Sequence, residues 1–183
     1  RGPTSMAENF KKSLGFDATR WPRLQKGLEF LYRISQPRRE GPRVFHPGGD
    51  THPGPDGPRS VEDYRTGDPR NWTTEEFPGF GVIFRNRPGT DRETYLAFKS
   101  GPNRGHFHGD QLSFHWCADA APIAVDHYCS YKPRAGQEHM HNRVAFATGD
   151  LPYANMDGYE RLIAFRTSDA VDVAVGQVES PRL

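Results

Sequence analysis

The chain has 183 residues, a formal net charge of +1 and two cysteines. That length fits one domain, or one domain and part of another, and two cysteines exclude a disulfide-rich scaffold. No apolar run approaches the roughly 18 residues of a membrane span, so we expect none. The first residues contain no basic-then-apolar leader, and we expect an internal piece of a longer soluble protein.

The first 35 residues carry a helical pattern. Its apolar side chains recur at spacings of three and four, at Trp21, Leu24, Leu28, Leu31 and Ile34. This spacing predicts one packed helix face, with Pro22 in the first turn and Pro37 ending the pattern. Residues 1–44 hold ten Lys/Arg against four Asp/Glu. We interpret these charges as a solvated helix surface and expect no nucleic-acid partner.

Residues 36–76 predict a linker or an ordered surface loop that detaches the helical start from a β core. Eight of the 16 prolines lie between residues 36 and 79, and so long an irregular stretch is unusual inside a compact domain. His46, Asp50 and His52 lie in it. They are potential metal ligands, but we interpret them as residues of the turns.

The remaining chain has a β pattern. Short apolar-rich runs occupy residues 80–86, 93–99, 112–117, 123–128, 143–147, 162–167 and 171–175. Repeated strands without intervening helices predict a mainly β fold, either an antiparallel meander or an antiparallel β-sandwich. A turn near residues 119–121 would place Cys117 opposite Pro122 or Ile123. Cys129 then lies beyond the roughly 7 Å Cα limit of a disulfide, so we expect both thiols to be unpaired.

Histidines are concentrated in one part of the chain. Six of the eight lie between positions 106 and 141. His108, Asp126 and His141 form a credible divalent-metal set, because zinc binds imidazole nitrogen and carboxylate oxygen. Asp110 and Asn142 suit the hydrogen bonds that orient such ligands. From spacing alone, histidines that only hydrogen-bond within a wet cleft remain an open alternative.

An ordered set of segments carries a family resemblance. Tyr95-Leu96-Ala97-Phe98-Lys99 precedes Gly105-His106-Phe107-His108-Gly109-Asp110, and Pro122-Ile123-Ala124-Val125-Asp126 and His141-Asn142 follow. Over about residues 77–146 this resembles the heparinase II/III-type polysaccharide lyases. The resemblance implies a fragment of an α-toroid plus β-sheet lyase. Residues 1–35 would be the tail of the helical toroid, residues 36–76 a linker and residues 77–183 the antiparallel β-sandwich.

The resemblance also implies an activity and its residues. These lyases cleave uronic-acid-containing polysaccharides by β-elimination, so an acidic polysaccharide substrate and a periplasmic or secreted location are expected. His106 would be the catalytic histidine, suited to proton transfer by an ordinary pKa of about 6.5. His108, Asp126 and His141 would hold a structural divalent metal, with zinc expected.

The chain departs from the family pattern in one respect. The family's tyrosine acid/base and its Asn or His partner come from the toroid, and no position in residues 1–35 matches them. We therefore expect this chain to carry part of an active site. Arg134 is a candidate contact for a substrate carboxylate, or else a surface residue. Tyr131 is a candidate substrate contact, with strand-end packing as its alternative.

Two rival functions remain at this point. A cupin-like metal enzyme also offers His-x-His on β-structure, but its pattern includes a Glu shortly after the second His. Here Gly109-Asp110-Gln111-Leu112-Ser113 follows, without a Glu. The other rival is a non-catalytic carbohydrate-binding sandwich whose histidines hold a stabilising metal. The sequence predicts neither the particular glycan nor the oligomeric state.

Overall fold

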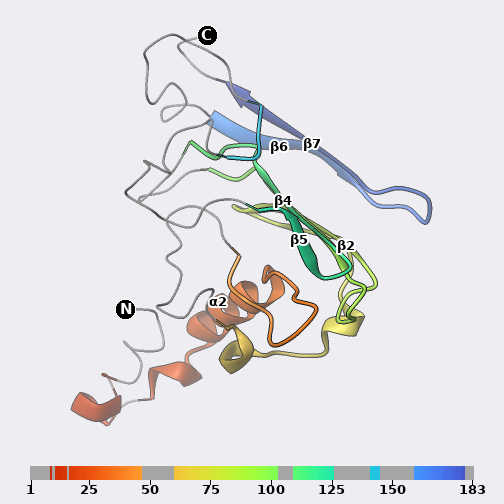
Figure 1. Ribbon diagram of the computed structural model, residues 1–183. Helices are drawn as coiled ribbons and strands as arrows, with labels where there is room; N and C mark the ends of the chain where they lie inside the picture. Colours follow the sequence, from red (N-terminus) through yellow and green to blue (C-terminus); the bar gives the residue numbers. More distant parts are fainter. Residues whose placement is uncertain are drawn as a thin grey trace.

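The computed structural model describes residues 9, 11–15, 17–46, 60–102, 109–125, 141–144 and 159–179. They form a five-stranded antiparallel sheet in the order β1-β2-β3-β4-β5 and a β6-β7 hairpin (Figure 1). The strands are β1 Glu75–Phe77, β2 Gly81–Asn86, β3 Thr94–Lys99, β4 Phe114–Ala118, β5 Ala121–Ala124, β6 Tyr159–Arg166 and β7 Val173–Glu179. The prediction of a mainly β, antiparallel fold with a short N-terminal helical segment is confirmed.

Helix α2, Pro22–Arg33, packs against the sheet. Pro22 occupies its first turn, where the missing amide hydrogen costs nothing. The Phe30 ring meets the edges of Phe77 and Phe80, with ring centres 5.9 and 6.0 Å apart. The expectation of a helix detached from the β core is therefore wrong, because aromatic side chains near the end of α2 complete that core. Trp21, at the start of the predicted apolar stripe, is exposed.

The described part of the Pro- and Gly-rich stretch runs beneath the sheet. The amide and carbonyl of Gln36 pair with those of Val44 at 3.0 and 3.1 Å, and the Val61 amide donates to Arg43 O at 3.0 Å. Val44 and Val61 are buried. Two short 3-10 helices follow, η2 (Glu62–Tyr64) and η3 (Pro69–Asn71). A third 3-10 helix, η1 (Ala18–Arg20), precedes α2.

Alternation along the strands divides the sheet into two faces. The face toward α2 carries Ile83 on β2, Tyr95 and Ala97 on β3, and Cys117 on β4, all fully or nearly fully buried with Ile34. Successive side chains of a strand point to opposite faces, so these residues share one side. Each fully buried large side chain of this kind contributes roughly 1.5–3 kcal/mol.

The β6-β7 hairpin lies on the other side of the sheet from α2 (Figure 1). Gly176 of β7 approaches the sheet so closely that an added Cβ would lie 2.5 Å from Leu112 Cδ2 and 2.8 Å from Phe98 Cζ. The crossing therefore requires glycine, which has no side chain, at position 176. A hydrogen bond of 2.5 Å from Thr74 to Asp172 also ties the hairpin to the sheet.

Several local predictions are confirmed. The turn between β4 and β5 consists of Asp119 and Ala120, both with positive φ, and Cys117 lies opposite Pro122 with a free thiol. Cys129 lies outside the described residues. Two local expectations differ from the structure. Arg143 and Val144, at the start of the strand expected over residues 143–147, are not in a strand. Strand β1 was not expected from the sequence. The meander order also differs from the jelly roll of a cupin. No described helix has the length and apolarity to cross a membrane.

Candidate functional site

Most of the predicted site residues lie outside the described part of the chain. These are His106, His108, Asp126, Tyr131 and Arg134. His141 is described, and so are the residues that flank the segments 103–108 and 126–140, which contain the other five. The sequence-based assignment of these six residues therefore stays a prediction, and the described geometry concerns the sheet end that holds their anchors.

Both anchors of the segment that contains His106 and His108 are held firmly. At its start, the amides of Ser100 and Gly101 donate to Phe80 O at 3.0 and 2.9 Å. A Cβ on Gly101 would lie 2.3 Å from Gly79 O, so the close contact with the β1-β2 turn requires glycine. At its end, Gly109 O accepts a hydrogen bond of 3.0 Å from Arg143 Nη1.

His141 lies against the beginning of β4. The next residue, Asn142, accepts a backbone hydrogen bond of 3.0 Å from Phe114, and Arg143 donates at 3.1 Å to the side chain of buried Gln111. His141 itself is buried, with 7% of the residue exposed. Because β5 ends with Ala124 paired to Trp116, the chain leaves and rejoins the sheet at the same end.

A buried ion pair lies at this sheet end. Lys99, the last residue of β3, contacts the fully buried carboxylate of Asp110 at 2.5 Å. A turn over residues 110–113 is closed by a hydrogen bond from Ser113 N to Asp110 O at 3.1 Å. Lys99 N donates to Ser113 O at 2.9 Å and joins this turn to β3. A buried carboxylate requires such a partner, so Asp110 fixes the chain immediately after the His106–His108 region.

His46 belongs to the same sheet end, although its sequence context indicated a turn. Its ring lies edge-on to His115, with centres 4.3 Å apart, and to Phe80 at 5.2 Å. Its Nδ1 lies 3.0 Å from Tyr95 Oη. Tyr95 Oη in turn donates to Ile34 O at 2.7 Å. Three segments distant in sequence thus converge on one buried imidazole.

The hydrogen-bond chain fixes the tautomer of His46. Because the only hydroxyl hydrogen of Tyr95 is given to Ile34 O, the His46 Nδ1–H donates to Tyr95. The lone pair therefore lies on Nε2, which is buried and has no hydrogen-bond partner among the residues described. Burial, and then the charge of Lys99, lower the pKa of His46 to about 3. The imidazole is neutral near pH 7 and presents an acceptor.

Sequence reasoning missed His46, His115 and Lys99 as members of this cluster. His115 is 1% exposed and lies opposite Ala97 in the register, on the face of the sheet toward α2. Its place in the dense histidine group was a signal for His115. His46 gave no comparable signal, because Tyr95 lies 49 residues away in sequence.

The described cluster combines neutral imidazole with a paired ammonium and carboxylate. A neutral imidazole can accept a hydrogen bond or ligate a metal, and an ammonium group can donate to a polar substrate group. The described residues contain no group of three or more His, Cys, Asp or Glu side chains that could hold a metal. Among them, His141 is the one predicted ligand, so the metal stays a prediction.

The fold and this sheet end define a class of protein: an antiparallel β domain with a packed N-terminal helix and a histidine-rich polar edge. The sequence matches no protein-family model and no curated protein. The fold is similar to that of two solved heparinase III structures. The match to the first has a TM-score of 0.63 at 15% identity, and it covers 87% of this chain and 28% of the heparinase III chain. The other has a TM-score of 0.63 at 13% identity, with 94% and 32% covered.

At identities this low, the structural similarity establishes a common fold and no more. The heparinase II/III resemblance found in the sequence is thereby confirmed at the level of structure. This chain spans less than a third of the length of each heparinase III chain that it matches.

Proposed function

We propose that this chain forms the β part of a polysaccharide lyase that cleaves a uronic-acid-containing polysaccharide by β-elimination. The observation that carries the proposal is the agreement of two independent features. The fold is similar to heparinase III over 87–94% of this chain. The ordered histidine motif lies on segments whose described anchors meet at one sheet end.

The elimination removes the C5 proton of the uronate and breaks the bond between C4 and the departing O4. The electron pair of the C5–H bond becomes the second bond between C4 and C5, while O4 departs with the electron pair of the C4–O4 bond and takes up a proton. In this proposal His106 is the catalytic histidine that polarises the substrate or transfers a proton. Arg134 would pair with a carboxylate of the substrate, and Tyr131 would contact the sugar.

His108, Asp126 and His141 would hold a divalent metal, with zinc proposed because its preferred ligands include imidazole and carboxylate. When bound, the ion supplies a fixed positive charge that pins the segments bearing its ligands. Burial of His141 agrees with a role of this kind. The hydrogen bond between His46 and Tyr95 and the Lys99–Asp110 pair would hold the backbone beneath those segments.

The substrate is proposed to be an acidic polysaccharide encountered outside the cytoplasm, which favours a periplasmic or secreted protein. The missing tyrosine acid/base is proposed to come from a helical region that is not part of this sequence. The present chain alone should then show little or no turnover.

The test is an ultraviolet assay for the unsaturated uronate product. The longest natural form of the protein that contains this chain would be incubated with heparan sulfate, alginate, ulvan and a neutral glucan. Unsaturated ends released from at least one acidic polymer, and none from the glucan, support the proposal. Binding to an acidic polymer without product on any of them would favour the non-catalytic carbohydrate-binding alternative instead.

A further inference from the structure

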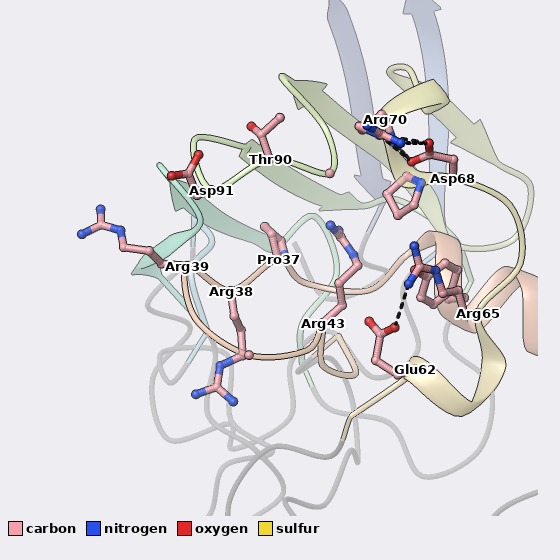
Figure 2. A pocket seen from close by; sticks show the side chains of 14 residues that line it. Pro37, Arg38, Arg39, Arg43, Glu62, Arg65, Asp68, Arg70, Thr90 and Asp91 are labelled. Atoms are coloured by element: carbon pink, nitrogen blue, oxygen red, sulfur yellow. Dashed lines mark hydrogen bonds and ion pairs between the residues drawn. The ribbon is translucent and has the colours of Figure 1, made fainter.

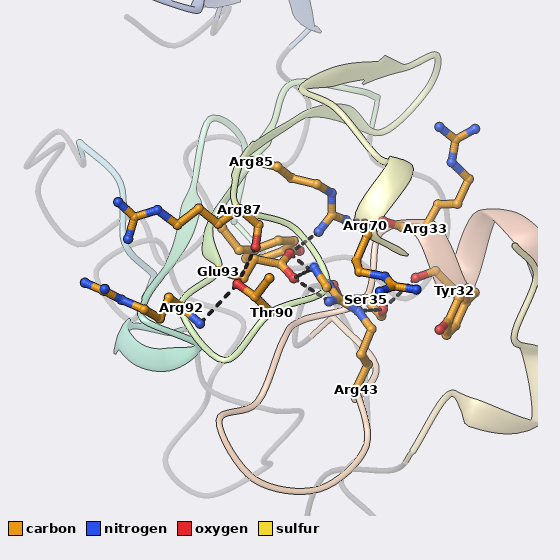
Figure 3. Close-up of polar contacts among 12 residues, drawn as sticks. Tyr32, Arg33, Ser35, Arg43, Arg70, Arg85, Arg87, Thr90, Arg92 and Glu93 are labelled. Atoms are coloured by element: carbon orange, nitrogen blue, oxygen red, sulfur yellow. Dashed lines mark hydrogen bonds and ion pairs between the residues drawn. The ribbon is translucent and has the colours of Figure 1, made fainter. Parts of the chain in front are cut away.

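A second polar region lies at the opposite end of the sheet, at the β2-β3 turn. Its centre is Glu93, whose carboxylate is fully buried. Arg43 Nη1 and Nη2 donate to it at 2.7 and 3.2 Å, and Arg85 Nη1 at 2.6 Å. The Gly89 amide adds a bond of 2.8 Å. Figure 3 shows the two guanidinium groups converging on this carboxylate.

This cluster holds more positive than negative charge. Two guanidinium groups share one carboxylate, and both lie over the Trp72 ring, 5.0 Å away for Arg43 and 4.7 Å for Arg85. Burial and the nearby charge of Arg43 lower the pKa of Arg85 to about 10. A desolvated excess of positive charge is unfavourable, and a nearby anion would compensate it.

Arg43 also forms the wall of a cavity of about 420 Å³. The cavity lies between the 37–43 turn, the segment containing η2 and η3, and the β2-β3 turn (Figure 2). Its charged lining consists of five arginines and three carboxylates, namely Arg38, Arg39, Arg43, Arg65, Arg70, Glu62, Asp68 and Asp91. Cations therefore exceed anions both in the lining and in the buried cluster behind it.

The arginines differ in how far they are already committed. Arg70 is held by Asp68 through contacts of 2.7–3.1 Å. Arg65 makes a single long contact of 3.9 Å with Glu62. Arg38 is exposed and has no hydrogen bond or ion pair with any residue that the structure describes, and its guanidinium points away from the other lining side chains (Figure 2). Arg38 and Arg65 can therefore turn toward a ligand.

Tyr32 supplies a donor of a different kind. Its side chain lines the cavity and the residue is 1% exposed. The ring meets the edge of Trp72, with centres 5.1 Å apart. Burial, and then the charge of Glu62, raise the pKa of Tyr32, so its hydroxyl keeps its hydrogen. A buried O–H in a cationic cavity suits an anionic oxygen.

We propose that this cavity binds a sulfate or carboxylate group of an acidic oligosaccharide. Arg38 and Arg65 make the direct contacts, Tyr32 donates from the wall, and the Arg43–Glu93–Arg85 cluster supplies the field. The site is separate from the histidine-rich edge, since β3 alone carries the chain about 16 Å from Thr94 to Lys99 at ~3.3 Å per residue. The saccharide as carrier of the anion rests on the proposed function, whereas the preference for an anion rests on the cavity itself.

The test measures binding by isothermal titration calorimetry on the intact 183-residue chain at low salt. The probes are a heparan-sulfate tetrasaccharide, an unsulfated polyuronate tetrasaccharide and inorganic sulfate. The double variant Arg38→Ala/Arg65→Ala removes two exposed cations of the cavity. The control Arg23→Ala/Arg166→Ala removes two exposed cations elsewhere, so both variants have the same net charge. Thermal unfolding of each variant confirms an intact fold.

We expect the cavity variant to lose at least about tenfold in affinity for one of the two tetrasaccharides, because charge-assisted hydrogen bonds are lost. The control should lose less than about twofold. Tyr32→Phe should lose about threefold to tenfold, the fold-change of one hydrogen bond. A stronger effect on the sulfated probe identifies sulfate, and an equal effect identifies the carboxylate. Binding of inorganic sulfate alone, or equal losses in both double variants, would overturn the proposal.

The outcome is independent of the lyase assay. If the longest natural form turns over substrate but the cavity variant binds the tetrasaccharides as the unmodified chain does, the cavity site is refuted and the lyase proposal stands. If binding depends on the cavity but the longest natural form shows no turnover, the lyase proposal is refuted and the anion site stands.

Discussion

Tyr95 links two residues that are distant in sequence: it accepts from His46 Nδ1 at 3.0 Å and donates to Ile34 O at 2.7 Å. The relay fixes which nitrogen of His46 carries hydrogen. It also ties the stretch after α2 to β3. The candidate site therefore rests on a buried polar connection as well as on the sheet.

The first prediction concerns this tautomer. Nitrogen NMR on the protein should show His46 protonated at Nδ1 and bare at Nε2 near pH 7. In Tyr95→Phe the acceptor is lost, so the Nδ1–H preference should disappear. That variant should also be destabilised by about 1–3 kcal/mol, because Ile34 O and His46 lose buried hydrogen bonds. An Nε2–H tautomer in the unmodified protein would contradict the relay.

The second prediction concerns acid stability. The pKa of His46 is about 3 in the folded chain against an ordinary 6.5. Between these values the unfolded state binds the extra proton. The free energy of unfolding should therefore be highest above pH 6.5 and fall toward pH 3, by up to about 1.4 kcal/mol per pH unit from this group. Urea titrations across this range should show a shallower decline for His46→Gln. Parallel curves for the two proteins would exclude His46 as the source.

The third prediction concerns Glu93. In Glu93→Gln the buried Arg43 and Arg85 lose their shared counter-charge, so the free energy of unfolding should fall by about 3–5 kcal/mol. Glu179→Gln is the matched control, because Glu179 is exposed and pairs with exposed Arg161. The control should change stability by about 0.5 kcal/mol or less. Chemical denaturation of both variants measures the difference. A loss below about 1 kcal/mol for Glu93→Gln would show that the cluster tolerates repulsion.

The fourth prediction separates backbone strain from steric overlap. Gly79 and Gly89 both have positive φ, of 84° and 71°. A Cβ on Gly79 meets nothing within 4 Å, whereas one on Gly89 would lie 2.8 Å from Arg70 N. Gly79→Ala should cost about 1–2 kcal/mol, the left-handed penalty alone. Gly89→Ala should cost more, because the β2-β3 turn must move away from η3. Equal losses in melting experiments would mean that the turn relaxes freely.

The fifth prediction concerns the metal. In the longest natural form, His108→Ala should lose bound zinc and stability, since metal binding is linked to folding. His106→Ala should keep metal and fold while losing about 10²–10⁴-fold in turnover, the usual effect of removing an acid/base or polarising group. Elemental analysis, melting and initial rates measure the three quantities. Equal metal in the protein and in the triple alanine variant of His108, Asp126 and His141 would refute the ligand set.

Features that depend on local backbone geometry could be predicted from the sequence. Short apolar-rich runs, the first two separated by a Pro-Gly turn, predicted most of β2, β3 and β4, because apolar, β-branched and aromatic residues favour strands. The turn at Asp119 and Ala120, and with it the position of Cys117, followed from the two short runs that flank it. Pro22 and the helical spacing predicted α2.

Which polar residues are buried together became visible only in the folded chain. His46 lies among turn-forming residues in sequence but beneath the sheet in the fold. Glu93 meets Arg43 across 50 positions. A buried polar group is stable only where partners distant in sequence complete its hydrogen bonds. Such a requirement produces no periodic pattern in the sequence from which it could be predicted. The orientation of α2 was decided in the same way, by Phe30 contacts with rings of the β1-β2 region that no local pattern specifies.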